Sequence, residues 1–338
     1  MIIGLTVIFI LVLLLPFSVQ AVEQHLEVFL FAMGILAATI SGVLDGALFI
    51  KAWKDPFHIS VAVLIAGLLF KWLHTPLKKG IVGISRVIPY RLFIAGIVIL
   101  LGLVSSIITA IIAALVLVMI VNALQLDRQS ELRFVILACF SIGLGAALTP
   151  IGEPLSTIAT SKLNEDFFFL FHLIGPDIMI AVCTFGLLAA IFVKRGNPSS
   201  QLSKGRDSES YHEIVIRALK IYLFVMGLTF LGAGFEPFIS HYLLGLNPLL
   251  LYWINIISAI LDNATLAAAE ISPTMDEHTI TAILLGLLIS GGMLIPGNIP
   301  NIIAAGKLQI TSKEWARFGI PIGLMTMIIY FIVILITM

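Results

Sequence analysis

The chain alternates long apolar runs with short polar segments. Continuous runs of about 20 residues, enough to cross a bilayer as an α-helix, begin within residues 2–22, 26–50 and 57–74. Strands of a membrane barrel would instead alternate apolar and polar positions, so the runs predict membrane-spanning helices. The first run has no basic residue before it, and we expect it to be retained rather than cleaved as a signal peptide.

Two further apolar segments are too long for one crossing. Residues 91–122 would rise about 48 Å as a single helix, against a hydrocarbon thickness of about 30 Å, and residues 243–271 pose the same problem. Each carries polar residues near its middle, around Ser105 in the first and around Ser258 in the second. We therefore expect two re-entrant hairpins, each with both arms on one side of the membrane.

A helix interrupted by Gly, Pro and polar residues follows each hairpin. The interruptions are residues 149–157, inside a helix expected over 133–165, and residues 296–301, inside a helix expected over 279–310. Such breaks free backbone groups that hydrocarbon cannot satisfy, and they are tolerated where they line a cavity. A surface turn between two spans is the simpler alternative for either break alone.

The two halves of the chain match each other. A shift of 145 residues aligns Gly152 with Gly297, and a shift of 153 aligns Ser105 with Ser258. The order of elements is also the same, which indicates an internal repeat. The predicted parts are N-terminal transmembrane helices at 1–56, a first repeat at 57–193, a cytoplasmic linker at 194–213 and a second repeat at 214–338.

The positive residues predict how the repeats are oriented. If both long segments are re-entrant, sixteen of the nineteen Lys and Arg fall on one side, and the exceptions are Lys51, Lys54 and Lys162. If both segments cross, the bias that orients membrane proteins disappears. We therefore expect about eight crossings, both termini outside the cell membrane and inverted repeats, an architecture of secondary transporters with sites near the midplane.

Composition sets the class. The chain is 60% apolar and 11% charged, with a mean hydropathy of +1.12, whereas about a quarter of residues are charged in soluble domains. This predicts an all-α polytopic membrane protein. The net charge of zero argues against nucleic acid, and leaves inorganic ions and the lipid bilayer as expected partners. Cys139 and Cys183 lack metal-ligand spacing, so we expect them to pack in apolar helices.

Asp262 is the first candidate for chemistry, because an unpaired carboxylate inside an apolar run is costly and usually marks a transport pathway. An acid that caps a helix at the membrane surface is the alternative. The candidate binding residues form two sets. The first contains Ser105, Ser106, Thr109, Thr149, Glu153, Ser156 and Thr157. The second contains Asp262, Asn263, Thr265, Asn298 and Asn301, with Ser258 at the start of the same stretch.

Carboxylate, amide and hydroxyl oxygens suit a small hard cation, and no Lys or Arg lies in either break to clamp an anion. We expect sodium to be held by Asp262, Asn263 and Glu153. No cofactor is expected beyond the transported sodium and protons.

The stretch Ser258-Ala-Ile-Leu-Asp-Asn-Ala-Thr265 resembles a hairpin tip of the ion transporter superfamily, and residues 297–307 resemble the second broken helix of its NhaD and arsenite branch. That superfamily includes NhaD-type sodium/proton antiporters, arsenite permeases and dicarboxylate carriers. The resemblance implies a hairpin and a broken helix in each inverted half, and a homodimer. The Ser-Asn-Thr tip of dicarboxylate carriers is missing at Ser105 to Thr109 and weak at 262–265, which points away from dicarboxylates.

The resulting hypothesis is a sodium or lithium/proton antiporter in which Glu153 and Asp262 alternate between a proton and the cation. A sodium-coupled symporter of a small anion or metalloid oxyacid is the nearest alternative, because helix N-termini near Gly152 and Gly297 supply positive dipole ends. An intramembrane enzyme is disfavoured, since no His-x-x-Glu-His or Gly-x-Ser-x-Gly pattern occurs. A passive channel is disfavoured by the repeat.

Overall fold

The computed structural model describes residues 1–195, 211–242 and 246–337, and within them every regular element is a helix. Five helices are long and apolar enough to cross a membrane. They are α5 (Tyr90–Ile108), α7 (Arg128–Ala146), α9 (Phe169–Phe192), α10 (Tyr211–Tyr242) and α15 (Ser312–Thr337). The prediction of an all-α membrane protein is confirmed.

The remaining elements are shorter, apart from α4. They are α1 (Ile2–Ser18), α2 (Gln20–Gln24), α3 (Leu26–Ser41), α4 (Gly46–Val87), α6 (Ala110–Leu124), α8 (Pro154–Leu163), α11 (Pro248–Ile254), η2 (Asn255–Ala259), α12 (Asn263–Glu270), α13 (Glu277–Gly291), η3 (Ile295–Gly297) and α14 (Ile299–Leu308).

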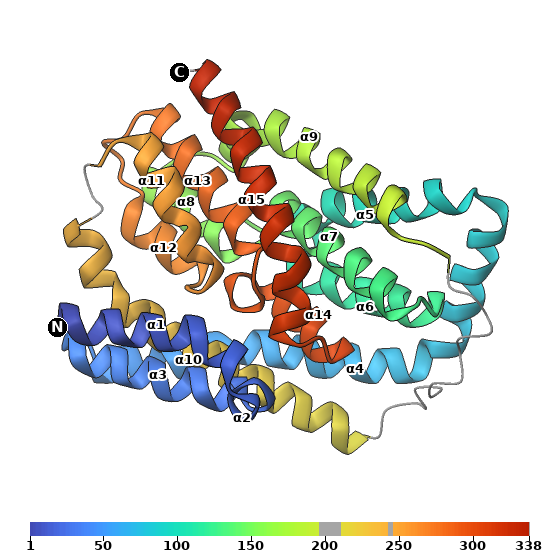
Figure 1. The fold of residues 1–338 in the computed structure, drawn as a ribbon, viewed down its shortest axis with the longest axis horizontal. Coiled ribbons are helices and arrows are strands. Elements are labelled where there is room, and N and C mark those ends of the chain that lie inside the picture. Colours follow the sequence, from blue (N-terminus) through green and yellow to red (C-terminus); the bar gives the residue numbers. More distant parts are fainter. Residues whose placement is uncertain (196–210, 243–245, 338) are drawn as a thin grey trace.

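Helices α1, α3, α4 and α10 form one layer of the molecule, and the other long helices form a second layer against it (Figure 1). The closest approach in the first layer is between α3 and α10. A Cβ at Gly34 would lie 2.4 Å from the carbonyl oxygen of Gly227, and one at Gly227 would lie 2.6 Å from the backbone nitrogen of Phe31. Glycines at this crossing let the two backbones touch, as small residues do between membrane helices.

The N-terminal third departs from the sequence prediction. The run expected over 26–50 is not one helix, because α3 ends at Ser41, where Gly42 takes a left-handed conformation with φ of 74°. The crossing expected at 57–74 is instead part of one helix, α4, which also includes the basic stretch after it and continues to Val87. Lys and Arg are good helix formers, so a basic stretch need not be a loop.

Other predicted bounds shift by a few residues. The boundary expected at 56/57 falls inside α4, and α7 begins at Arg128 instead of 133, since Asp127 caps it by accepting the N–H of Ser130. Most of the linker expected at 194–213 lies outside the described residues, and α10 begins at Tyr211.

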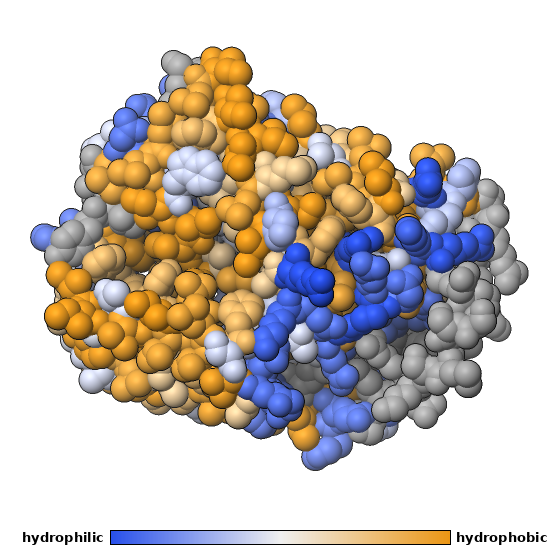
Figure 2. All heavy atoms as spheres, viewed as in Figure 1, coloured by the Kyte–Doolittle hydropathy of each residue, from blue (hydrophilic) through white to orange (hydrophobic). Residues whose placement is uncertain are grey.

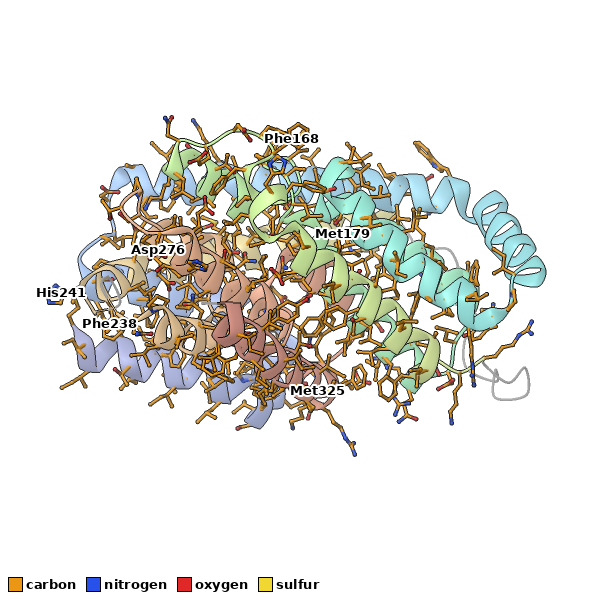
Figure 3. The ribbon with its side chains drawn as sticks, turned by 90° about the horizontal axis from the view of Figure 1, so that it is seen from above. Phe168, Met179, Phe238, His241, Asp276 and Met325 are labelled. Carbon is orange, nitrogen blue, oxygen red and sulfur yellow. The ribbon has the colours of Figure 1, made fainter. Side chains whose placement is uncertain are left out.

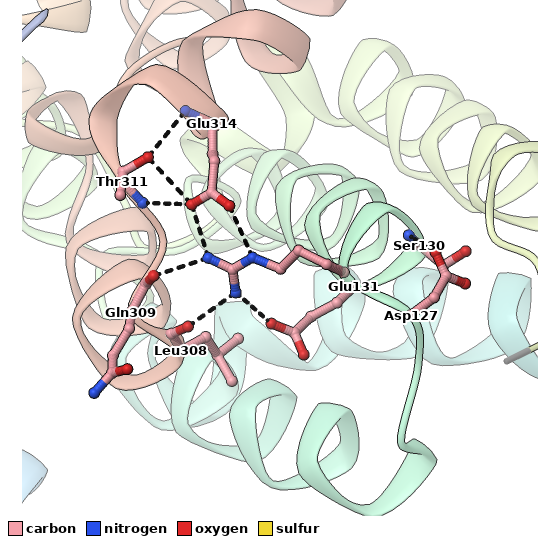
Figure 4. Close-up of polar contacts among 8 residues, drawn as sticks. Asp127, Ser130, Glu131, Leu308, Gln309, Thr311 and Glu314 are labelled. Atoms are coloured by element: carbon pink, nitrogen blue, oxygen red, sulfur yellow. Dashed lines mark hydrogen bonds and ion pairs between the residues drawn. The ribbon is translucent and has the colours of Figure 1, made fainter. Parts of the chain in front are cut away.

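Hydrophilic side chains gather on the side where α14 meets α15 and where α7 begins, and most of the remaining visible face is apolar (Figure 2). Arg128 holds these helices together (Figure 4). Its guanidinium forms ion pairs with Glu131 at 2.8 Å and Glu314 at 2.7 Å. It also donates to the carbonyl oxygens of Leu308 at 3.1 Å and Gln309 at 2.8 Å, at the end of α14. We call this group the Arg128 clasp.

Candidate functional site

Two helices end near the centre of the molecule and resume after a short non-helical segment (Figure 1). The first break separates α7 from α8, and the second separates α13 from α14, with η3 inside it. Both resuming helices have proline in their first turn, where its missing N–H costs nothing. The other first-turn N–H groups lack helical partners, so each start is a site of positive potential.

Glycine makes both breaks sterically feasible. A Cβ at Gly152 would lie 1.9 Å from the carbonyl oxygen of Ala146. A Cβ at Gly297 would lie 2.6 Å from the carbonyl oxygens of both Gly291 and Ser258. In each break the chain therefore folds back directly onto the end of the preceding helix, which a larger residue would prevent.

The turn between α5 and α6 is bonded to the first break. Thr109 forms this turn with φ of 75°, a strained conformation for a β-branched residue. The next residue, Ala110, donates its N–H to the carbonyl oxygen of Gly152 at 2.9 Å. The hydroxyl of Thr149 donates to the carbonyl oxygen of Ser106. Backbone groups freed by the break are thus partly satisfied by the turn.

The two halves share a hydrogen bond at matching positions. The Ser105 hydroxyl donates to the carbonyl oxygen of Ile142 at 3.0 Å, and the Ser258 hydroxyl donates to that of Leu287 at 3.1 Å. Each bond joins the arm before a turn to the helix that precedes a break. Both serines therefore have a structural role, because each hydroxyl proton is used in a hydrogen bond between two helical segments.

Helices α8 and α12 pack against each other and run parallel. Glu153 is the N-cap residue of α8 and Asp262 is that of α12. At the other ends of the helices, the Lys162 ammonium on α8 donates to the carbonyl oxygens of Ala268 and Ile271 on α12. The two N-termini consequently lie together, and the two carboxylates are close enough to interact electrostatically.

The two acids have different surroundings. The Asp262 carboxylate accepts the N–H of Thr265 at 3.1 Å and its hydroxyl at 3.3 Å, and Asp262 is partly exposed. Glu153 is only 5% exposed, and its Oε1 has no hydrogen-bond partner among the described residues. The same is true of the buried Ser156 Oγ and Asn263 Nδ2. An uncompensated buried charge is costly, so this cluster is suited to taking up a proton or a cation.

The structure regroups the predicted site residues. Glu153 lies near Asp262 as well as next to the turn between α5 and α6, because α8 packs on α12 while Gly152 is bonded to Ala110. The amide of Asn301 is committed to carbonyl oxygens of Gly291 and Leu294, both at 2.9 Å. The others lie elsewhere: Ser105, Ser106, Thr109 and Thr149 at the first turn, Ser258 against Gly297, Asn298 against Gly143, and Thr157 on the exposed side of α8.

Three polar residues near this region are absent from the predicted site. Lys51, near the start of α4, interacts electrostatically with Asp262, and nothing in the sequence relates two residues so far apart. Asn255 and Glu270 are both buried in the second hairpin. Glu270 stands out in the sequence as an acid in an apolar run, which is the signal that identifies such residues.

One protein family matches almost the whole chain. No curated protein matches the chain. The family DUF1646, described as a protein of unknown function, matches residues 2–337 and so includes both breaks and both hairpins. The chain therefore belongs to the DUF1646 family.

Proposed function

We propose that the protein is a secondary active transporter that exchanges sodium or lithium for protons by alternating access. The observation that carries this proposal is the meeting of Glu153 and Asp262 at the adjacent N-termini of α8 and α12. Two carboxylates so close repel each other unless a positive charge lies with them. Either a small cation or a proton can supply this positive charge. The two ions therefore compete for one site, and this competition is the basis of exchange.

Inverted repeats are part of the same proposal. The matching serine hydrogen bonds, the two glycine-dependent breaks and the shared order of elements support them. The packing is also crossed, because α6 contacts α14 and α12 contacts α8. A site between such halves lies near the membrane midplane. Location in the cell membrane with both termini outside, membership of the ion transporter superfamily and a homodimer remain predictions.

A sodium-coupled symporter of a small anion or metalloid oxyacid is the second candidate. The specific observation in its favour is the electrostatic interaction of Lys51 with Asp262. Together with the positive ends of α8 and α12, this lysine would attract an anion. The two carboxylates would repel an anion and attract a cation. For that reason antiport is the first candidate.

Flux measurements on purified protein in liposomes test the proposal. The liposomes have an acidic lumen and contain a pH-sensitive dye, and sodium chloride is added outside. We expect the lumen to become alkaline with sodium or lithium chloride but not with choline chloride. Asp262→Asn should abolish this response, while Asp276→Asn should retain it, because Asp276 is an exposed N-cap on α13 that bonds Thr279.

Two results would contradict antiport. Sodium uptake that leaves the lumen pH unchanged and requires a co-transported oxyanion would favour the symporter. A double variant, Glu153→Gln with Asp262→Asn, that folds normally and exchanges sodium for protons at the parent rate would remove the proposed site altogether.

A further inference from the structure

The second hairpin contains a buried carboxyl group that the proposed exchange does not use. Glu270, the last residue of α12, is 1% exposed, and neither carboxylate oxygen has a hydrogen-bond partner among the described residues. The side chain of Asn255, which is fully buried, lies beside it. Asn255 Oδ1 also lacks a partner, and its amide, which interacts with the Glu270 carboxyl group, donates a long bond of 3.4 Å to the carbonyl oxygen of Ile283.

Within the part of the chain that the structure describes, no positive side chain acts on Glu270. The nearest candidate on α8, Lys162, donates instead to backbone carbonyl oxygens of α12. On α13 the charged residues Glu277 and His278 occupy the exposed first turn. An ionised carboxylate left in this state costs several kcal/mol, so the group is stable only with a bound proton or a bound cation.

Packing alone does not require polar groups at these positions. The shift of 153 residues that matches Ser105 with Ser258 places Leu117 opposite Glu270 and Gly102 opposite Asn255. Leu117 is fully buried in α6 and Gly102 is buried in α5. The first hairpin therefore builds the same arrangement from apolar residues, and the Glu270–Asn255 pair is an addition specific to the second hairpin.

We propose that Glu270 and Asn255 form a second binding site for a small monovalent cation. The eight residues from Asp262 to Glu270 place it about 12 Å along α12 from the first site. One carboxylate and one amide oxygen are hard ligands of the kind that sodium takes. This inference extends the proposed function, since a second bound ion would change the number of cations carried in each cycle.

Equilibrium binding of radioactive sodium to the purified full-length protein tests the second site without relying on transport. The wild type should bind two sodium ions per chain, Glu270→Gln and Asp262→Asn one each, and the double variant none. Glutamine has the shape of the neutral carboxyl group, so folding should be retained, and thermal unfolding checks it. Each lost charge should weaken its own site about a hundredfold or more.

The two sites fail separately in this design. If Glu270→Gln binds as much sodium as the wild type, the second site does not exist, whatever Asp262→Asn does. If only Asp262→Asn has no effect, the first site is wrong and the second stands. Should Glu270→Gln not fold, Glu270→Asp keeps the charge but shortens the side chain. Glu270→Asp should lower the sodium affinity of one of the two sites. Unchanged sodium affinity at both sites would overturn the proposal.

Discussion

Glu153 and Asp262 occupy the N-cap positions of neighbouring helices, yet the structure gives them unequal environments. Asp262 is partly exposed and holds Thr265 through two hydrogen bonds, whereas Glu153 is buried with one oxygen unpaired. Asp262, the more exposed of the two, is better placed to receive the incoming ion. The residue that is buried is better placed to keep a proton while the site is closed.

Substituting the two acids one at a time should therefore have different effects. Asp262→Asn keeps the N-cap of α12, since Asn is as good a cap as Asp, but removes the charge that offsets desolvation of the cation. We expect sodium affinity to fall about a hundredfold or more and exchange nearly to stop. Glu153→Gln should flatten the pH dependence of exchange more than it weakens affinity. Initial rates against sodium concentration at several pH values measure both, and identical effects would contradict the assignment of roles.

Glycine at the breaks gives a second residue-scale prediction. Gly152→Ala and Gly297→Ala should each destabilise the fold by about 1–3 kcal/mol, the usual cost of overpacking, because the added Cβ would meet backbone oxygens at 1.9 Å and 2.6 Å. Gly306→Ala in α14 is the matched control, since its Cβ would meet nothing within 4 Å. That variant should gain about 0.5–1 kcal/mol of helix stability. Thermal unfolding in detergent compares the three, and a tolerated Gly152→Ala would contradict the tight break.

At the scale of elements, the Arg128 clasp joins the start of α7 to the junction of α14 and α15, so it links segments from the two halves. The hydrogen bonds and charge of Arg128 hold the pKa of Glu314 below its ordinary value. A carboxyl group with a lowered pKa stabilises the folded state above its unfolded pKa. That contribution is lost as the pH falls through the folded pKa.

Arg128→Gln should therefore lower the free energy of unfolding at pH 7 by about 1 kcal/mol or less, the usual size for a partly exposed ion pair. The difference from the wild type should shrink in acid, below the ordinary range for glutamate, to what the hydrogen bonds from Arg128 to Leu308 and Gln309 contribute. Arg317→Gln, at an exposed arginine on α15, is the control and should change little. Denaturant unfolding at neutral and acid pH gives the comparison, and a loss that is independent of pH would mean that the Glu314 pair is not its origin.

The sequence predicts elements well where glycine, proline or polar residues interrupt apolar runs. The all-α membrane class follows from composition and run length alone. Two predicted bounds were wrong. The helix expected over 26–50 ends at Ser41, because a single glycine follows it, and the crossing expected over 57–74 is part of the longer α4, which continues through basic residues. The chemistry of Glu153 and Asp262 led us to expect them in one sodium site, but the packing that brings them together could not be read from the sequence. Their proximity depends on α8 packing across the molecule against α12.

At the scale of the whole molecule, the start of α13 and the end of α9 lie toward opposite ends (Figure 1), and Asp276 lies toward the same end as His241 on α10 (Figure 3). The proposed orientation puts the end with Asp276 outside the cell and the end of α9 in the cytoplasm. Helices of the first half contact helices of the second half, so the middle of the molecule is complete only when both halves are present.

Cysteine labelling tests this orientation. In a background with Cys139 and Cys183 replaced, Asp276→Cys should react with a membrane-impermeant maleimide added to intact cells. Arg195→Cys, exposed just after α9, should react only after the membrane is permeabilised. Labelling of both from the same side would contradict the inverted arrangement, and exchange of the two patterns would reverse the orientation.

The crossed packing of α6 on α14 and of α12 on α8 also bears on how the protein is made. The ribosome delivers α6 and α8 to the membrane well before α14 and α12 are synthesised. Until then, the faces of α6 and α8 that will contact the second half have no partner from their own chain. Insertion of the first half is thus separate in time from its assembly, and the site between α8 and α12 forms only after α12 has entered the bilayer.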